Sequence, residues 1–278
     1  PGHARSRALL VRGIGLAYLA AFLSLRWQIA GLLGTHGLAP ARALLDSIDR
    51  SRGAHALLEL PTLFWLGASD AALEQACAIG AAAAGCLVLG VLPFYAAAAC
   101  FGLYLSLVNV GQRFLGYQWD ALLLEAGFLA LLLAPRGLRL GGWRRREPSP
   151  IGIFLARWLL FRLMFFSGYV KLASGDPVWR NLTALDYHYW TQPLPAWTSW
   201  YAARLPSLAQ RASCAAMFAI ELVLPFAIFS GRRARLIAFG GFVLLQAAIA
   251  ATGNYGFFNL ITAVLALSLL DDHDLARA

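Results

Sequence analysis

The sequence predicts an all-α protein, a polytopic bundle of transmembrane helices, and three observations lead to this fold class. Of its 278 residues, 60% are hydrophobic and 13% are charged, whereas soluble domains contain about 45–50% apolar and about 25% charged residues. The apolar runs approach the length of about 20 residues that a helix needs to cross a bilayer. They lack the period-two alternation that a transmembrane barrel requires. We therefore expect the lipid bilayer to be a partner of this chain.

The apolar runs and the residues that interrupt them predict about eight spans. The runs lie near residues 9–27, 71–90, 93–111, 119–134, 151–172, 212–230, 234–252 and 256–270. Leu92-Pro93 separates the second run from the third, because proline interrupts a helix. Arginine-rich segments follow the fourth and sixth runs, and a glycine-containing turn follows the seventh. We expect residues 1–278 to form a single transmembrane domain.

The net charge of +9 comes from arginines that mostly lie between the apolar runs. Such arginines report membrane topology, so nucleic acid is not expected as a partner. The dense clusters occupy the short segments 135–150 and 231–235; they are Arg136, Arg139, Arg144, Arg145 and Arg146, then Arg232, Arg233 and Arg235. These two clusters lie on the cytoplasmic side of the membrane only if the N-terminus also lies there. We therefore expect both termini in the cytoplasm and two long connections, about 28–70 and 173–211, as an extracytoplasmic cap.

Composition also indicates the compartment. Lys171 is the only lysine among 23 basic residues, and alanine is abundant, which is typical of a GC-rich bacterial genome and predicts the bacterial inner membrane. The alternative, for a eukaryotic source, is the membrane of the endoplasmic reticulum. The four cysteines lie inside apolar runs without CxxC spacing, so we expect small core residues, no metal site and no cofactor. Because the chain opens at Pro1 without Met and stops soon after an apolar run, we expect one or both ends to have been cut.

Polar residues within apolar spans are candidates for function, because lipid disfavours them. At the outer end of the third span, Asn109, Gln112 and Arg113 have the i, i+3, i+4 spacing of one helix face. Asp120 and Glu125 then enter the fourth span from the same side. These residues either form a functional polar network or hold a helix hairpin together through an Arg113–Asp120 ion pair.

The fifth span carries three cations, Arg157, Arg162 and Lys171. At about 100° per residue, Arg157 and Lys171 share a face, whereas Arg162 points elsewhere. Because an unpaired buried charge is costly, we predict that Arg162 contacts Glu125 on the fourth span. The amine of Lys171 has a pKa that falls when it is desolvated. Lys171 is therefore a candidate general base or a specific ammonium contact; the alternative is a lysine that extends to the membrane surface.

The connection after Lys171 holds many aromatic and polar residues. Asp176-Pro177 favours a turn that can bring a carboxylate back to the Lys171 amine. His188 has no second His or Cys at metal-ligand spacing, so a zinc site is not expected. The other candidate residues of this connection are Trp179, Arg180, Asp186, Tyr187 and Gln192. Glu221 in the sixth span and Asn259 in the eighth are further polar groups that either hold helices together or belong to a site.

At these residues the sequence resembles the lipase maturation factor family. The matching stretches are YLSLVNVGQRFLGYQWDALLLEAGFLALLLAP (104–135), RWLLFRLMFFSGYVKLASGDPVWRNLTALDYHYWTQPLP (157–195) and GNYGFFNLITAVLALSLLDD (253–272). The resemblance implies a polytopic membrane protein whose vertebrate members reside in the endoplasmic reticulum and are required for secreted homodimeric lipases to fold and assemble. Members usually continue into a large, more soluble C-terminal region that contacts clients, and we expect this sequence to lack that region.

A fainter similarity links Phe166-Ser-Gly168-Tyr-Val-Lys171-Leu172, followed by Asp176 and Trp179, to the membrane part of vitamin K-dependent γ-carboxylase. In that enzyme a lysine at the matching place is the base that deprotonates the vitamin. The resemblance implies a catalytic role for Lys171 alone.

Two functions follow from these patterns. The first is a non-enzymatic membrane maturation factor whose outer cap helps exported hydrolases or lipases to fold. The alternative is a membrane enzyme for a quinone-like or lipid substrate, with Lys171 as general base and Asp176 and His188 assisting. Neither the client nor the oligomeric state follows from the sequence.

Overall fold

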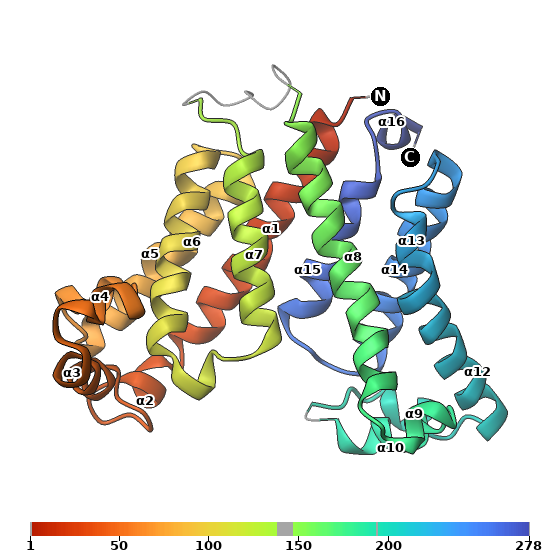
Figure 1. Ribbon diagram of the computed structural model, residues 1–278, viewed down its shortest axis with the longest axis horizontal. Helices are drawn as coiled ribbons and strands as arrows, with labels where there is room; N and C mark the ends of the chain where they lie inside the picture. The colour runs from red at the N-terminus through yellow and green to blue at the C-terminus, as the bar shows by residue number, and fades with distance from the viewer. Residues whose placement is uncertain (1, 138–146, 193, 278) are drawn as a thin grey trace. The chain divides into compact units, whose positions relative to one another are not determined.

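The computed structural model describes residues 2–137, 147–192 and 194–277 (Figure 1). Within these residues every regular element is a helix, and the one β-type pairing is an isolated bridge between Pro195 and Gly253. The all-α fold class is therefore confirmed. Four members of the predicted cytoplasmic cluster lie outside the described residues: Arg139, Arg144, Arg145 and Arg146.

In this described part of the chain, six helices are long and apolar enough to cross a membrane. They are α1 (Ala4–Arg26), α5 (Asp70–Leu89), α6 (Pro93–Val110), α8 (Pro150–Ala173), the helix that continues from α12 to α13 (Ser207–Ala227), and α14 (Arg232–Thr252). The fourth and eighth predicted spans are also helical, but α7 (Gln118–Leu133) has 16 residues and α15 (Phe257–Ala266) has 10. The count of about eight spans therefore stays a prediction.

The chain divides into two compact units. The N-terminal unit contains Val11–Ser149, and the C-terminal unit contains Pro1–Leu10 together with Pro150–Ala278. The order of elements recurs between them, because in each unit a long helix leads into a long connection of short helices, and three longer helical segments follow. Whether residues 1–278 act as a single domain stays a prediction.

The core of the N-terminal unit is built around three buried aromatic rings. Tyr18 and Phe22 of α1 lie with centroids 5.6 Å and 5.5 Å from that of Tyr104 of α6. The Tyr18 hydroxyl donates to the Leu123 carbonyl at 3.1 Å, which joins α1 to α7. Gly127 leaves space for this hydroxyl, since a Cβ at that position would overlap it. The apolar helices therefore pack through specific ring contacts and buried hydrogen bonds.

The connection of the N-terminal unit is ordered and helical. It contains α2 (Ile29–Leu33), α3 (Ala41–Arg52), η1 (Gly53–His55), α4 (Ala56–Glu59) and the 3₁₀ helix η2 (Leu63–Leu66), and a short 3₁₀ helix η3 (Gln112–Phe114) joins α6 to α7. Thr62 caps η2 by accepting from the Phe64 N–H. The first predicted outer connection is thus a folded layer.

In the C-terminal unit, α8 packs against α15, α13 and a π-helical segment, η5 (Ala219–Val223). This segment lies between α12 (Ser207–Phe218) and α13 (Leu224–Ala227), and α14 covers α13 and α15. After α15 come the 3₁₀ helix η6 (Leu267–Leu269) and α16 (Asp274–Arg277). Figure 1 shows α8 and the α12–α13 helix as long neighbouring rods of this unit.

The connection of the C-terminal unit contains α9 (Pro177–Arg180), α10 (Ala184–Thr191) and α11 (Ser199–Ala202). It is fixed to the turn between α14 and α15. Gln192 Nε2 donates to the Thr252 carbonyl at 2.7 Å, and the Asn254 N–H donates to the Leu194 carbonyl at 3.1 Å. The second predicted outer connection is therefore also an ordered layer.

The opposite end of the C-terminal unit joins the two ends of the described chain. The Asp272 carboxylate accepts from the backbone N–H groups of Ala4 and Arg5 at 3.1 Å and 2.8 Å. The Asp272 N–H in turn donates to the Gly2 carbonyl at 2.8 Å. A carboxylate 267 residues away thus caps the first turn of α1, where unpaired N–H groups favour negative charge.

Candidate functional site

Lys171 and Glu221 form a close ion pair inside the C-terminal unit. The Lys171 Nζ lies 2.7 Å from both carboxylate oxygens of Glu221. The Lys171 side chain is 24% exposed and the Glu221 side chain is 6% exposed. Because the Lys171 amine donates to both oxygens of this carboxylate, a substrate would have to displace Glu221 in order to reach it. The geometry therefore favours the specific ammonium contact over the general base.

The local backbone explains how Glu221 reaches this position. The π-helical turn adds a residue to the helix, and Pro225, which follows it, has no N–H to continue the regular ladder. On α8, Gly168 lies one turn before Lys171. A Cβ on Gly168 would lie 2.8 Å from the Leu222 side chain and 3.0 Å from the Glu221 Cβ. The glycine thus allows α8 to approach the π-helical turn closely enough for the ion pair to form.

An aromatic ring from the connection covers the same ammonium group. The Lys171 Nζ lies 5.7 Å from the centroid of Trp179, within the range of a cation–π interaction. Trp179 packs edge to face against Phe218 of α12, with centroids 6.1 Å apart. Apolar neighbours continue this cluster: Val178, Leu182, Ala184, Leu185, Cys214, Met217 and Leu222. The cluster and the ion pair together attach α9 and α10 to the long helices.

His188 lies in the same region as Lys171. Its ring stacks on Tyr255 with centroids 6.4 Å apart, and its Nε2 is 3.5 Å from the Tyr255 hydroxyl. Burial, and secondly the positive charge of Lys171, lower the pKa of His188 below its ordinary value. The neutral imidazole is therefore favoured beside the ammonium ion. No metal ligand set forms around His188 in the ranges that the structure describes.

The expected return of Asp176 to the Lys171 amine is wrong. The Asp176 carboxylate accepts from the Val178 N–H at 3.0 Å and caps α9, while the partner of Lys171 is Glu221. An aspartate two residues before an unpaired N–H satisfies that donor locally, which competes with the longer reach to the amine. Asp176 is exposed and has a structural role at the start of α9.

The remaining candidates of the C-terminal unit separate into inner and outer groups. Gln192 is buried and binds the Thr252 carbonyl, whereas Arg180, Asp186 and Tyr187 are exposed. Asn259 on α15 is buried, and its Oδ1 has no hydrogen-bond partner among residues 2–137, 147–192 and 194–277. The connection therefore presents some predicted residues outward and uses others to hold itself in place.

The single helical face predicted for Asn109, Gln112 and Arg113 is wrong, because α6 ends at Val110 and Gln112 begins the 3₁₀ helix η3 with a positive φ of 49°. Asn109 and Gln112 nevertheless both hold the connection of the N-terminal unit. Asn109 Nδ2 donates to the Pro61 carbonyl at 2.7 Å, and Gln112 Nε2 donates to the Ala39 carbonyl at 3.0 Å. One turn earlier, the Ser106 hydroxyl accepts from the Leu63 N–H at 3.1 Å. These side chains supply hydrogen bonds that a loop cannot satisfy within itself.

The predicted Arg113–Asp120 ion pair is wrong. Asp120 is buried and accepts from the Tyr104 hydroxyl at 2.6 Å and from the Tyr117 N–H at 3.2 Å, whereas Arg113 is exposed. The start of α7 needs a cap, and Asp120 supplies it from the third helical residue. Glu125 and Arg162 belong to different units, so their contact stays a prediction.

Residues 5–277 match the family model of the lipase maturation factor transmembrane domain. Lipase maturation factor 2 of Gallus gallus is 48% identical over 98% of this chain and 39% of its own length, and the Homo sapiens protein of that name is 45% identical over 99% and 41%. The chain belongs to the lipase maturation factor family.

A more distant member of the family is also similar over nearly the whole chain. Lipase maturation factor 1 of Homo sapiens is 34% identical over 96% of this chain and 48% of its own length. No solved structure matches the chain. The chain spans about two fifths of the length of its lipase maturation factor 2 relatives. It is an integral membrane domain of this family. Because the named relatives are vertebrate proteins, the bacterial location stays a prediction.

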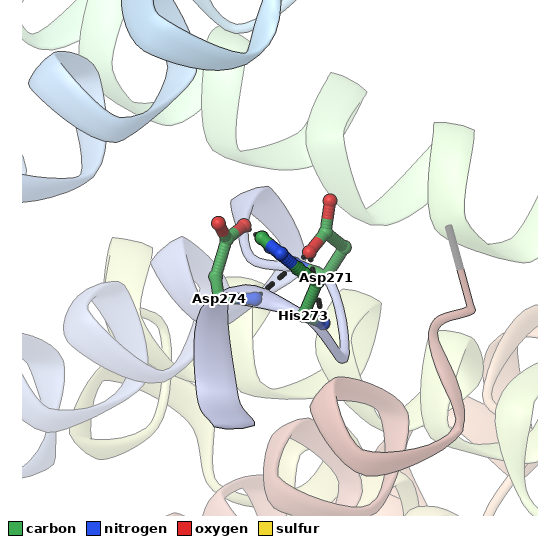
Figure 2. A group of neighbouring side chains, drawn as sticks. All are labelled: Asp271, His273 and Asp274. Carbon is green, nitrogen blue, oxygen red and sulfur yellow. Dashed lines mark hydrogen bonds between the residues drawn. The ribbon is translucent and has the colours of Figure 1, made fainter. Parts of the chain in front are cut away.

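A second group of ionisable side chains in this lipase maturation factor domain lies at the start of α16. Asp271, His273 and Asp274 place possible ligand atoms within 4.8 Å of one another (Figure 2). Both carboxylates already have partners, since Asp271 accepts from the His273 and Asp274 N–H groups and Asp274 pairs with Arg232. Arginines and capping contacts thus account for this cluster, and we assign no metal to it.

Arg157 serves this same end of the C-terminal unit. Its Nε donates to the Ser268 carbonyl at 3.0 Å. Arg157 and Lys171 share a face of α8, as predicted, but lie 14 residues apart along the helix. At about 1.5 Å per residue this is about 21 Å, so the two cations do not belong to one site.

The pairing of Glu221 was the main point that sequence reasoning about this family member missed. Glu221 lies 14 residues after Ser207, the first residue of α12, which at about 1.5 Å per residue places it about 21 Å along the helix. The second half of α12, with Cys214, Met217 and Phe218, packs against α10 before the chain reaches Glu221. A signal was present, since Lys171 and Glu221 are isolated opposite charges in apolar spans, where each requires a partner.

Proposed function

We propose that this domain assists the folding or assembly of exported proteins of the lipase class, and that clients contact the outer face of α10. Membership of the lipase maturation factor family supports the first part. The second part is supported by one observation. Tyr187 and Trp190, one turn apart on α10, are 59% and 64% exposed, although the helix below them is fixed in place.

The sequence of α10 explains this exposure. Ala184, His188 and Gln192 follow an i, i+4 spacing and face inward, where they meet the Phe218 cluster, Tyr255 and the Thr252 carbonyl. Tyr187 and Trp190 are offset from that row and point outward. Large aromatic side chains on a rigid support lose little entropy on binding, so they are suited to contact apolar segments of a client. The short helix therefore acts as a platform.

The enzyme alternative receives no support from this geometry. A base for a quinone-like or lipid substrate needs a free amine, and the Lys171 amine is engaged by both Glu221 oxygens. In this proposal Lys171 is a positioning residue that attaches α9 and α10 to the bundle. Lys171→Arg keeps the positive charge and removes the titratable amine. The larger guanidinium fits the narrow space beside Gly168 less well and should lower the yield of folded protein, but the protein that does fold should still mature clients. Loss of maturation in a stably folded Lys171→Arg protein would favour the base.

The client contact is tested by photo-crosslinking in membranes of the native host. A photoreactive phenylalanine derivative replaces Tyr187 or Trp190, and crosslinked partners are identified by mass spectrometry. We expect exported hydrolases of the lipase class. The matched controls are Leu57 and Leu58 of the N-terminal connection, which are 60% and 82% exposed and should give none of these products. Equal crosslinking from all four positions would contradict the assignment of α10.

Function is then measured in a strain without the chromosomal gene. The double variant Tyr187→Ser/Trp190→Ser should lower the activity of an exported lipase several-fold, while Tyr187→Phe/Trp190→Phe, which keeps both rings, should retain it. The amount of variant protein in the membrane must equal that of wild type. Full lipase activity in the strain that lacks the domain would exclude the maturation role itself.

A further inference from the structure

Segment 197–211 of the C-terminal unit combines exposed rings with cations. Five large apolar side chains are exposed: Trp197 (80%), Trp200 (44%), Tyr201 (62%), Leu205 (48%) and Leu208 (79%). Arg204 and Arg211 are also exposed. The sequence contains no acidic residue between Asp186 and Glu221. Apolar surface and positive charge therefore occur together in a stretch of sequence that contains no carboxylate.

Hydrogen bonds hold this segment in place at both ends. The Thr198 hydroxyl donates to the Ala251 carbonyl in the last turn of α14. Gln210 Nε2, on α12, donates to the Ala202 carbonyl at 2.7 Å. The exposed side chains thus sit on a fixed backbone, and their exposure is a property of the fold.

The same bonds fix the position of the segment along the bundle. It joins the beginning of α12, at Ser207, to the end of α14, at Thr252. Both helices are long and apolar enough to cross a membrane. The segment therefore lies where two spans leave the hydrocarbon region. Trp and Tyr are enriched at this depth, because their rings have one apolar and one polar edge.

The arginines indicate which part of the interface is contacted. The Arg204 guanidinium stacks on the Trp200 ring, 3.5 Å from the ring centroid. The indole therefore fixes the plane in which the guanidinium N–H groups lie. A planar guanidinium binds phosphate oxygens through two parallel hydrogen bonds. Asp186, by contrast, lies beside the proposed client face of α10. The lack of acidic residues thus distinguishes segment 197–211 from α10.

We propose that segment 197–211 is an interfacial anchor for glycerophospholipids. Trp197, Tyr201 and Leu208 enter the region just below the headgroups, and Arg204 and Arg211 bind the lipid phosphates. The anchor holds α11 and the first turn of α12 at the membrane surface. This role is separate from client contact through α10.

The proposal is tested by nitroxide labelling in vesicles of phosphatidylcholine and phosphatidylglycerol. The background carries Cys77→Ala, Cys86→Ala, Cys100→Ala and Cys214→Ala, since all four cysteines are free. Single variants Trp197→Cys, Tyr201→Cys and Leu208→Cys are compared with Tyr187→Cys as the matched exposed position. Power saturation measures whether each label collides with oxygen, which enters lipid, or with a water-soluble nickel chelate.

Labels at 197, 201 and 208 should have an oxygen-to-nickel collision ratio several-fold above that at 187. A ratio at 197 and 201 equal to that at 187, with all labels accessible to nickel, would overturn the anchor. High ratios at all four positions would support the anchor and contradict the client face on α10, so the two proposals fail separately. The pair Arg204→Gln/Arg211→Gln should lower the ratio at 201; an unchanged ratio would remove phosphate binding from the proposal.

A second measurement does not depend on the cysteine-free background. Lipids brominated near the headgroup quench tryptophan fluorescence at the interface. In Trp197→Phe/Trp200→Phe, two of nine tryptophans are removed. The quenchable fraction should fall relative to wild type if these rings lie at the interface. An unchanged quenchable fraction would place both rings in water and overturn the anchor.

Discussion

The Lys171–Glu221 pair gives the most direct test of how the C-terminal unit is held together. Replacing Lys171 with Met removes the ammonium ion but keeps a flexible chain of similar length. The carboxylate of Glu221, whose side chain is 6% exposed, is then left without its counter-ion. Because a buried, unpaired charge is much less favourable than a paired one, Lys171→Met should destabilise the unit strongly.

The distances set the size of this effect. At 2.7 Å and an effective dielectric constant of about 20, Coulomb's law gives an attraction of about 6 kcal/mol. Desolvation opposes part of it, so Lys171→Met should cost about 3–5 kcal/mol in the free energy of unfolding. Glu221→Gln should cost less, about 2–3 kcal/mol, because the Lys171 side chain is 24% exposed and keeps its cation–π contact with Trp179. At about 2–4 °C per kcal/mol, Lys171→Met should lower the Tm by about 6–20 °C.

A double-mutant cycle in detergent micelles measures the coupling between the two residues. Lys171→Met/Glu221→Gln should lose less stability than the sum of the single variants by at least about 2 kcal/mol. The matched control is the surface pair Arg52–Glu59 at 3.1 Å, whose side chains are 59% and 48% exposed. Its cycle should give a coupling below about 1 kcal/mol. Strictly additive losses at Lys171 and Glu221 would refute the ion pair.

Three further effects on stability should be measurable by thermal unfolding. Gly127→Ala should lower the free energy of unfolding by about 1–3 kcal/mol, because the added Cβ overlaps the Tyr18 hydroxyl. Adding Tyr18→Phe, which removes that oxygen, should recover part of the loss. Additive losses in the double variant would be inconsistent with the overlap. Burial and then the charge of Lys171 hold the pKa of His188 below its ordinary value, so the unfolded chain binds this proton more tightly and stability should fall as the pH drops below about 6.5. That fall should be shallower in His188→Asn, and identical pH profiles would contradict the assignment. Asp272→Ala removes both capping hydrogen bonds at the start of α1 and should lower the free energy of unfolding by about 1–2 kcal/mol, with a smaller loss in Asp272→Asn. Equal stability of the wild type and both variants would show that the cap is unimportant.

The sequence predicted the long helices because lipid restricts the choices. An apolar run near the length of a bilayer has to satisfy its backbone within itself, so each run forms a helix. The boundaries were less accurate. The sixth span was placed from residue 212, whereas α12 begins at Ser207. Polar residues such as Arg211 mark the edge of an apolar run but do not stop a helix that packs against protein, as α12 does against α10.

The candidate residues were found more readily than their partners. Asn109 and Gln112 were identified as one polar face, but their acceptors are backbone carbonyls of residues 48 and 73 positions earlier. A backbone carbonyl has no sequence signature, because every residue carries one. Asp120 illustrates the same difficulty, since its partner is the hydroxyl of Tyr104 on the preceding helix. Local spacing indicates which side chains share a face, but long-range packing decides what they bind.

The geometry also gives a reason for a single lysine in a chain otherwise rich in arginine. The space beside Lys171 is narrow, because α8 approaches the π-helical turn at Gly168, where even a Cβ would meet Leu222 at 2.8 Å. A compact ammonium ion reaches both oxygens of Glu221 and still lies over Trp179. A planar guanidinium is larger and needs its partners in its own plane. The shape of the cation therefore explains the lysine without any requirement that its amine be titratable, which agrees with a structural rather than a catalytic role.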